Sequence, residues 1–133
     1  MTFLNQIGQI GVSVNDTDAA EAFYCNTLGL RKLFRYGALL FIDCAGVRVM
    51  IEGNTTDAEF KPSSSCLYFR SPDLALAYPD LQSKGVMFTD EPHLIAPMPD
   101  HDLWMVFFKD PAGNLLALMQ EAPKGHTVWP PTA

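Results

Sequence analysis

Two histidines in one proline-rich segment are the side chains of this sequence best suited to proton transfer. His93 and His101 both fall within residues 89–102, where three prolines stiffen the chain. Asp100 and Asp102 flank His101, and a nearby carboxylate can orient an imidazole as a general base. If the protein is an enzyme, we expect His93 to be its catalytic base. The alternatives are that His93 belongs to an ordinary strand and that His101 lies in an exposed polar turn.

A cysteine and two arginines are the other candidates for chemistry. Cys66 could act as a nucleophile only if a neighbouring cation lowered its pKa, and Arg70 follows four residues later on the same side of an expected strand. Otherwise Cys66 is a buried, inert thiol. Arg48 and Arg70 could together hold a carboxylate or phosphate, or could be ordinary surface charge.

The elements that must position these groups occur in the same order twice. Hydrophobic alternation and helix-capping signals predict strand, helix, strand, strand, strand in each half. The helices begin at Asp16 and Asp73 and end at Gly29 and Gly85, and Pro79 is expected to kink or split the second one. The expected strands are residues 7–14, 30–34, 38–43 and 47–51, then 66–70, 86–89, 103–109 and 114–119.

Matching turns support a duplication. Asp43-Cys44-Ala45-Gly46 aligns with Asp110-Pro111-Ala112-Gly113, and the longer second half requires one insertion before Leu103. A βαβββ unit leaves one sheet face uncovered, so we expect two units to pair. The predicted organisation is a single domain, 1–124, made of modules 5–52 and 64–120, with a connector at 53–63 and a C-terminal tail at 125–133 that is either loose or packed.

Composition narrows the class of protein. The 133 residues suit one domain, and a net charge of −6 argues against a nucleic-acid partner. No apolar run is long enough for a membrane span, and no secretory signal precedes the first strand, so no membrane partner is expected. The three cysteines form no CxxC pair. We therefore expect free thiols and a cytoplasmic location.

Three segments carry a family resemblance: Val14-Asn15-Asp16, Ala22-Phe23-Tyr24-x-x-x-Leu28-Gly29-Leu30, and the run from Asp110 to Leu116. Together they resemble the vicinal oxygen chelate superfamily of glyoxalases, bleomycin-resistance proteins, extradiol dioxygenases and methylmalonyl-CoA epimerases. The resemblance implies an α+β fold with two tandem βαβββ modules forming a cup-shaped, curled mixed sheet. It also implies a homodimer.

In that superfamily four side chains of the cup usually hold a divalent metal. Counting seven residues back from the two helix-opening aspartates gives Gln9 and Cys66, and counting four on from the two turn glycines gives Met50 and Ala117. The family pattern is His or Gln, Glu, His, Glu, so only Gln9 fits. We therefore expect no metal cofactor, unless non-standard ligands hold a divalent ion. Glu52 shares a strand face with Met50 and either approaches the cup or caps the strand end in solvent.

The resemblance and this degenerate metal site predict a protein that binds a small, partly apolar molecule in the cup between the modules. Gln9 would be the polar anchor and Tyr68 a stacking ring. The remaining expected ligand contacts are Met50, Glu52, Cys66, Ala117 and Met119. The alternative is a lyase, isomerase or dioxygenase-type enzyme that uses His93 as a base or a non-standard metal site.

Overall fold

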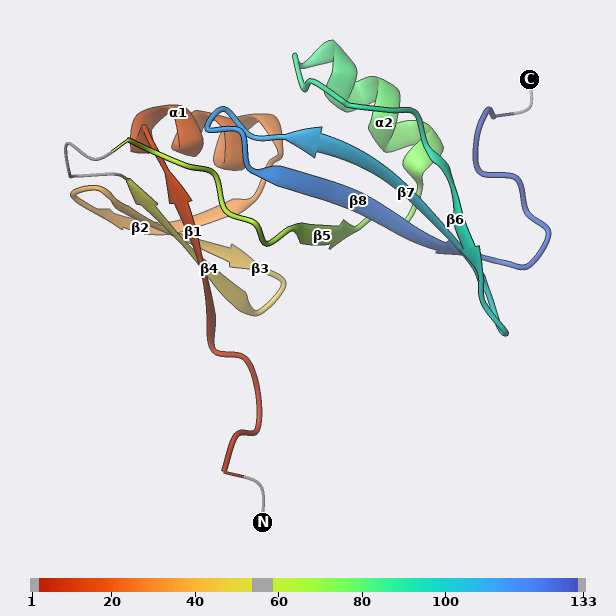
Figure 1. Cartoon of the computed structure of the whole chain (residues 1–133), viewed down its shortest axis with the longest axis horizontal. Coiled ribbons are helices and arrows are strands. Elements are labelled where there is room, and N and C mark those ends of the chain that lie inside the picture. The colour runs from red at the N-terminus through yellow and green to blue at the C-terminus, as the bar shows by residue number, and fades with distance from the viewer. Residues whose placement is uncertain (1–2, 54–58, 132–133) are drawn as a thin grey trace. The chain divides into compact units, whose positions relative to one another are not determined.

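Within residues 3–53 and 59–131, which the computed structural model describes, the chain forms two four-stranded mixed sheets (Figure 1). One sheet lies in each of two compact units, Met1–Ser63 and Ser64–Ala133. Among these residues no helix has the length and apolar character needed to cross a membrane.

The first unit orders its strands β1-β4-β3-β2. β1 pairs in parallel with β4, and the other pairs are antiparallel. A helical segment follows β1 and begins at Asp16, whose carboxylate accepts from the backbone N–H groups of Asp18 and Ala19. The bounds are β1 Gln9–Val14, α1 Thr17–Glu21 with its π-helical continuation Ala22–Thr27, β2 Arg31–Tyr36, β3 Leu39–Cys44 and β4 Val47–Gly53.

The second unit repeats the topology as β5-β8-β7-β6, with β5 parallel to β8. Asp73 caps α2 as Asp16 caps α1, by accepting from two backbone N–H groups of the first turn. The bounds are β5 Leu67–Arg70, α2 Leu74–Ser83, β6 His93–Pro97, β7 Asp102–Lys109 and β8 Leu115–Ala122. The α+β class and the tandem βαβββ modules are therefore confirmed.

Residues 86–89 do not form the strand that their sequence predicts. Phe88 makes a single bridge to Phe108, and the strand that pairs with β7 is β6, inside the segment taken as an insertion. The ring of Phe88 packs against those of Tyr78, at 4.7 Å, and Phe108, at 5.5 Å. Its apolar neighbour Val86 is also buried. The apolar pattern of this segment thus reflects packing between helix and sheet, not strand pairing.

The second unit also tests the predictions for Pro79 and for the C-terminal tail. α2 continues through Pro79 without a break, so the predicted split is wrong. The described part of the tail is packed: Val128 is buried, and the ring of Trp129 lies 5.0 Å from that of Tyr78. In the expected connector, Gly53 belongs to β4, and residues 54–58 lie outside the described residues.

The turn between β7 and β8 explains the Asp-Pro-x-Gly-Asn motif. Asp110 and Asn114 are both buried polar residues. The Asp110 carboxylate accepts from the backbone N–H groups of Ala112 and Asn114 and from the side-chain amide of Asn114, at 2.8–3.0 Å. Because buried polar groups must be paired, this network fixes where β8 begins and which of its residues face each way.

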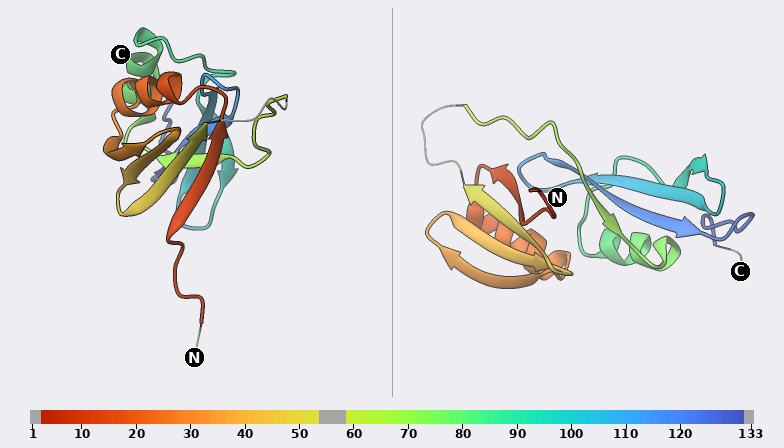
Figure 2. Two further views of the ribbon diagram at one scale, coloured as in Figure 1. Left: turned by 90° about the vertical axis from the view of Figure 1, so that its left-hand side faces the viewer. Right: turned by 90° about the horizontal axis from the view of Figure 1, so that it is seen from below.

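Each sheet has one face against its helix and one face away from it. In β4, Val49 and Ile51 are buried, while Arg48 and Glu52 alternate with them and are exposed. Figure 2 shows α2 along one side of the β5-β8-β7-β6 sheet. We call the sides away from the helices the first open face and the second open face.

Replacement of Gly53 tests the contact between α1 and the end of β4. A Cβ at this position would overlap the Thr17 hydroxyl and approach the Ala38 Cβ to 3.3 Å. The hydroxyl donates to the Ala38 carbonyl oxygen at 2.9 Å, so it cannot turn away without losing that bond. We expect Gly53→Ala to lower the free energy of unfolding in urea by about 1–3 kcal/mol.

Gly8→Ala is the matched control, because nothing lies within 4 Å of a Cβ there. Its effect on the free energy of unfolding should stay within about 0.5 kcal/mol. Equal stability of the two variants would show that the Thr17 contact is not tight.

Candidate functional site

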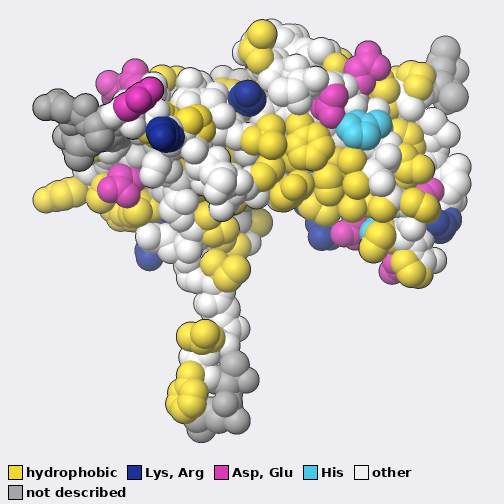
Figure 3. Space-filling model, viewed as in Figure 1, with side chains coloured by type: hydrophobic (Ala, Val, Ile, Leu, Met, Phe, Trp, Pro, Cys, Tyr) yellow, Lys and Arg dark blue, Asp and Glu magenta, His cyan; other side chains and the backbone are white. Residues whose placement is uncertain are grey.

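The second open face is an apolar surface with a polar margin. Strand register sets its members in rows across the sheet, with Met105 and Met119 in one row and Phe107 and Ala117 in the next. Figure 3 shows apolar side chains gathered over β7 and β8 on the side turned to the viewer. Members of this face include Tyr68, Arg70, His93, Leu103, Met105, Phe107, Ala117, Met119 and Glu121.

Two aromatic rings close over the alanine at the centre of this face. Tyr68 and Phe107 are the register partners of Ala117 on its two sides, and their rings meet edge to face at 6.2 Å and 80°. Ala117 is fully buried, whereas Tyr68 remains 50% exposed. A larger residue at 117 would separate the rings, so alanine at this position creates a continuous aromatic surface.

Cys66 lies beside Tyr68 but is not an activated nucleophile. Burial raises the pKa of the Cys66 thiol, and a hydrogen bond with Tyr68 offsets only part of this rise. The pKa of Tyr68 is raised too, chiefly by the charge that Cys66 would carry as a thiolate. The Arg70 guanidinium pairs with Glu121 at 3.2 Å. Cys66 is therefore better interpreted as an inert thiol.

His93 lies at the margin of the second open face, at the start of β6. Its register partner is Met105, so it shares a row with Met105, Met119 and Arg70. The side chain is 47% exposed, and its Nδ1 atom is 2.8 Å from the Glu91 carbonyl oxygen. The structure thus places His93, Tyr68, Ala117 and Met119 on one face of the second sheet.

His101 is placed in a different environment. It lies in the turn between β6 and β7, where its Nδ1 is 2.7 Å from Asp100, and this hydrogen bond lowers the pKa of the Asp100 carboxyl. Asp102 points to the tail instead. It accepts from Lys124 at 2.8 Å and from the Gly125 N–H at 2.9 Å, which lowers the pKa of Asp102. The Asp-His-Asp sequence is therefore not one hydrogen-bonded group.

The first open face carries Gln9, Met50 and Glu52, as the alternation predicts. Gln9 is already engaged: its Oε1 accepts from Arg48 at 2.8 Å and its Nε2 lies 3.6 Å from the Met50 sulfur. Glu52 is exposed, opposite Ser13 and Leu39. Further along the sheet the rings of Phe34 and Phe41 stack at 4.5 Å, and the Arg48 guanidinium lies 5.9 Å from the Phe41 ring centre.

The residues at the family's metal positions do not fit a divalent ion. In the first unit, the only oxygen ligand at these positions belongs to Gln9 and already accepts from a guanidinium, whose positive charge opposes a cation. In the second unit, the positions hold a thiol of raised pKa and a buried methyl group. Among the described residues no three His, Cys, Asp or Glu side chains gather where they could hold a metal.

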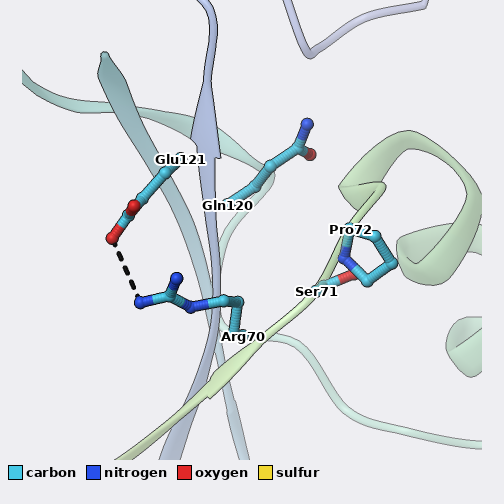
Figure 4. Close-up of a pocket in the computed structure, with 5 residues that line it drawn as sticks. All are labelled: Arg70, Ser71, Pro72, Gln120 and Glu121. Atoms are coloured by element: carbon cyan, nitrogen blue, oxygen red, sulfur yellow. Dashed lines mark hydrogen bonds and ion pairs between the residues drawn. The ribbon is translucent and has the colours of Figure 1, made fainter. Parts of the chain in front are cut away.

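A hollow of 410 Å³ lies at the end of β5, next to the second open face (Figure 4). Arg70 and Glu121 pair across it, and Gln120 uses its amide oxygen to accept from the Leu74 N–H at the start of α2. The other lining residues are Ser71 and Pro72. The hollow therefore has a polar rim. Most hydrogen-bonding groups of this rim already bond to other groups of the same unit.

Three residues of these faces were not singled out from the sequence. Met105 and Phe107 belong to the second open face, and their alternation with Val106 and Phe108 was a usable signal. Asp90 is the third. Its carboxylate accepts from the Phe107 N–H at 2.9 Å and lies 3.5 Å from His93 Nδ1. Only the tertiary structure brings these three residues together.

The sequence matches the family model of the Glyoxalase/Bleomycin resistance protein/Dioxygenase superfamily over residues 6–118. This match covers most of the chain and agrees with the duplicated fold. The chain therefore belongs to that superfamily. No curated protein sequence matches it.

Solved structures give the same fold. A member of the superfamily from Sphaerobacter thermophilus is 25% identical, with a TM-score of 0.73 over 90% of this chain and 100% of that one. Lactoylglutathione lyase from Agrobacterium tumefaciens is 19% identical, with a TM-score of 0.70 over 90% and 96%. A virulence protein from Salmonella typhimurium is 16% identical, with a TM-score of 0.73 over 91% and 100%. The last two likenesses show the fold alone.

Alkylation of Cys66 tests its environment. Because the thiolate is the reactive form, a raised pKa lowers the rate with iodoacetamide at pH 7.5 below that of the same cysteine in the urea-unfolded chain. Tyr68→Phe removes the hydrogen bond that lowers this pKa, so Cys66 should react several-fold more slowly still.

Peptide-resolved mass spectrometry gives the rate at each cysteine in one sample. Cys44, in the other unit, is the internal control, and its rate should not change in Tyr68→Phe. A Cys66 that reacts faster in the folded than in the unfolded chain would instead identify an activated nucleophile.

Proposed function

We propose that this chain binds a small, partly apolar molecule on the second open face, without a metal ion. The observation that carries the proposal is the aromatic and methionine surface of Tyr68, Phe107, Met105 and Met119 on the side of the sheet away from α2. Buried aromatic and apolar walls with a few polar groups are typical of small-molecule sites.

The shape and chemistry of this surface indicate the kind of ligand. The half-exposed Tyr68 ring offers a flat stacking surface and a hydroxyl that can orient a polar group. The methionines beside it adapt to different outlines because their thioethers are flexible. A flat ligand with one or two polar substituents fits these groups best. Gln9, Met50 and Glu52 line the corresponding face of the first unit, and we propose ligand contacts for them there.

A mutational comparison tests this site. A fragment library of flat heteroaromatic compounds is screened by thermal shift, and each hit is titrated. At 100 times its Kd a ligand should stabilise the fold by about 2.7 kcal/mol, which raises the Tm by several degrees. Tyr68→Ala should weaken hits by about 5- to 150-fold, because a stacked aromatic contact contributes about 1–3 kcal/mol.

Leu76→Ala is the matched control, since Leu76 is an exposed apolar residue of α2, 70% accessible. It should leave each Kd unchanged. Gln9→Ala in the same titration reports on the first open face. Hits whose Kd is the same in Tyr68→Ala as in the unmodified chain would contradict the proposed site.

Metal independence is part of the proposal. The donor set at Gln9, Met50, Cys66 and Ala117 lacks a carboxylate. Calorimetric titration with Ni²⁺, Zn²⁺, Mn²⁺ and Fe²⁺ should therefore show no stoichiometric binding at micromolar concentration. Stoichiometric binding that disappears in Gln9→Ala or Glu52→Ala would contradict this and restore the metal-dependent alternative.

The second candidate function is an enzyme of the lyase, isomerase or dioxygenase type that uses His93 as its base. One observation favours it: His93 lies at the margin of the same surface, in the row of Met105 and Met119. A ligand that covered those methionines would bring its edge to the imidazole.

We also propose that the chain acts as a homodimer in the cytoplasm. The outer strand β2 has exposed apolar side chains at Leu33, Phe34 and Tyr36, and β6 has them at Leu94 and Ile95. Uncovered edge strands of this kind tend to pair. The three thiols are free, which suits a reducing compartment.

A further inference from the structure

Arg70 and Glu121 form an ion pair beside the hollow at the end of β5 (Figure 4). The pair joins one nitrogen, Arg70 Nη2, to one oxygen, Glu121 Oε1, at 3.2 Å. A guanidinium carries several N–H donors and a carboxylate accepts at both oxygens, so this contact uses a small part of either group. The side chains are 70% and 36% exposed, and such exposed pairs contribute little to stability. A ligand can therefore engage both side chains without destabilising the fold.

The charges of this pair restrict the class of ligand. A ligand with only a carboxylate would be attracted by Arg70 and repelled by Glu121, and a ligand with only an ammonium group would meet the reverse. Because the two side chains are in contact, these opposing interactions largely cancel. A zwitterion avoids the cancellation, since its carboxylate can accept from Arg70 while its ammonium group donates to Glu121.

The hollow has room and further polar groups for a zwitterionic head group. Its volume of 410 Å³ falls in the range of about 300–1,000 Å³ that is usual for small-molecule sites. Ser71 Oγ accepts from the Asp73 N–H at 3.3 Å and keeps its own proton for a ligand carboxylate. Gln120 Oε1 accepts from the Leu74 N–H at 2.8 Å, which holds this side chain at the wall with its amide nitrogen as a donor.

The apolar part of the second open face begins directly beside the ion pair. Arg70 is the register partner of Met119, and Tyr68 lies two residues before Arg70 on the same face. The Tyr68 side chain is half exposed, so its ring is accessible for stacking. A ligand whose head group lies at the ion pair can thus extend a flat group over Met119 toward the Tyr68 ring.

We propose that the hollow binds the zwitterionic head group of an α-amino acid with a flat, apolar side chain. Arg70 holds the carboxylate and Glu121 holds the ammonium group. Both groups of such a molecule are attached to one carbon atom, so they lie close together, as their two protein partners do. This inference rests on the proposed binding surface and adds the class of ligand to it.

Calorimetric titration of the full chain with L-tryptophan tests the site. We expect saturable binding that weakens in Tyr68→Ala. Tryptamine lacks the carboxylate and indole-3-propionate lacks the ammonium group. Each should bind about tenfold more weakly than L-tryptophan, because it loses one charge-assisted contact and is repelled by the side chain that its remaining charge resembles.

Variants of the ion pair should reverse this order of affinities. Arg70→Gln leaves the Glu121 charge unbalanced, so L-tryptophan should bind about tenfold more weakly while tryptamine binds more tightly than to the unmodified chain. Glu121→Gln should likewise weaken L-tryptophan and strengthen indole-3-propionate. Lys84→Gln is the matched control. It removes another exposed ion pair, between Lys84 and Asp80 at 3.0 Å, and should leave all three affinities unchanged.

The outcomes separate this inference from the proposed function. If flat hits require Tyr68 but L-tryptophan binds no more tightly than its two analogues, the amino-acid inference is overturned and the binding surface stands. If neither the hits nor L-tryptophan depend on Tyr68, both proposals are overturned. Loss of L-tryptophan in Arg70→Gln without a gain of tryptamine would overturn the charge assignment, because it would show that the substitution does not act through Glu121.

Discussion

Each sheet of this protein has two faces, and a helix covers only one of them. The buried side is complete: Val12, Leu40, Ile42 and Ile51 in the first unit, and Leu74, Val106 and Leu116 in the second, are almost fully removed from water. The alternate residues of these strands lie on the side away from the helices. Because function depends on particular sites and not on the fold, the chemistry of the open faces must be argued from their own side chains.

The chemistry of the two open faces differs because their side chains do. In the first unit Arg48 donates a hydrogen bond to the amide oxygen of Gln9, so this face is polar and charged. In the second unit alanine at 117 allows Tyr68 and Phe107 to meet, which leaves an aromatic one. Gln9 therefore forms a hydrogen-bonded pair with Arg48 in one sheet, and Ala117 lies beneath an aromatic pair in the other. This difference favours apolar ligand binding on the second open face.

His93 is placed beside an apolar surface by strand pairing. Asp90 is tied to β7 through the Phe107 N–H, and β6 pairs His93 with Met105. The apolar surface next to the imidazole thus comes from strand pairing, whereas its polar neighbours Asp90 and Glu91 are local in the chain. A histidine in the equally proline-rich turn, His101, meets an exposed carboxylate and no such surface.

The sequence by itself determined the duplicated fold, because its determinants are local. Asp16 and Asp73 cap helices within three residues of themselves, and Asp110 and Asn114 close a turn within five. The family resemblance pointed to Gln9, Met50 and Ala117, and strand alternation added Tyr68 and Glu52. The third strand of the second unit was mislocated because residues 86–89 and 93–97 are both short and apolar, and only packing against Tyr78 and pairing with β7 distinguish them. The tertiary structure alone decided that Arg70 pairs with Glu121 and that the Asp90 carboxylate accepts from the Phe107 N–H. Each of these depends on side chains brought together across a sheet or a loop, which spacing along one chain does not specify.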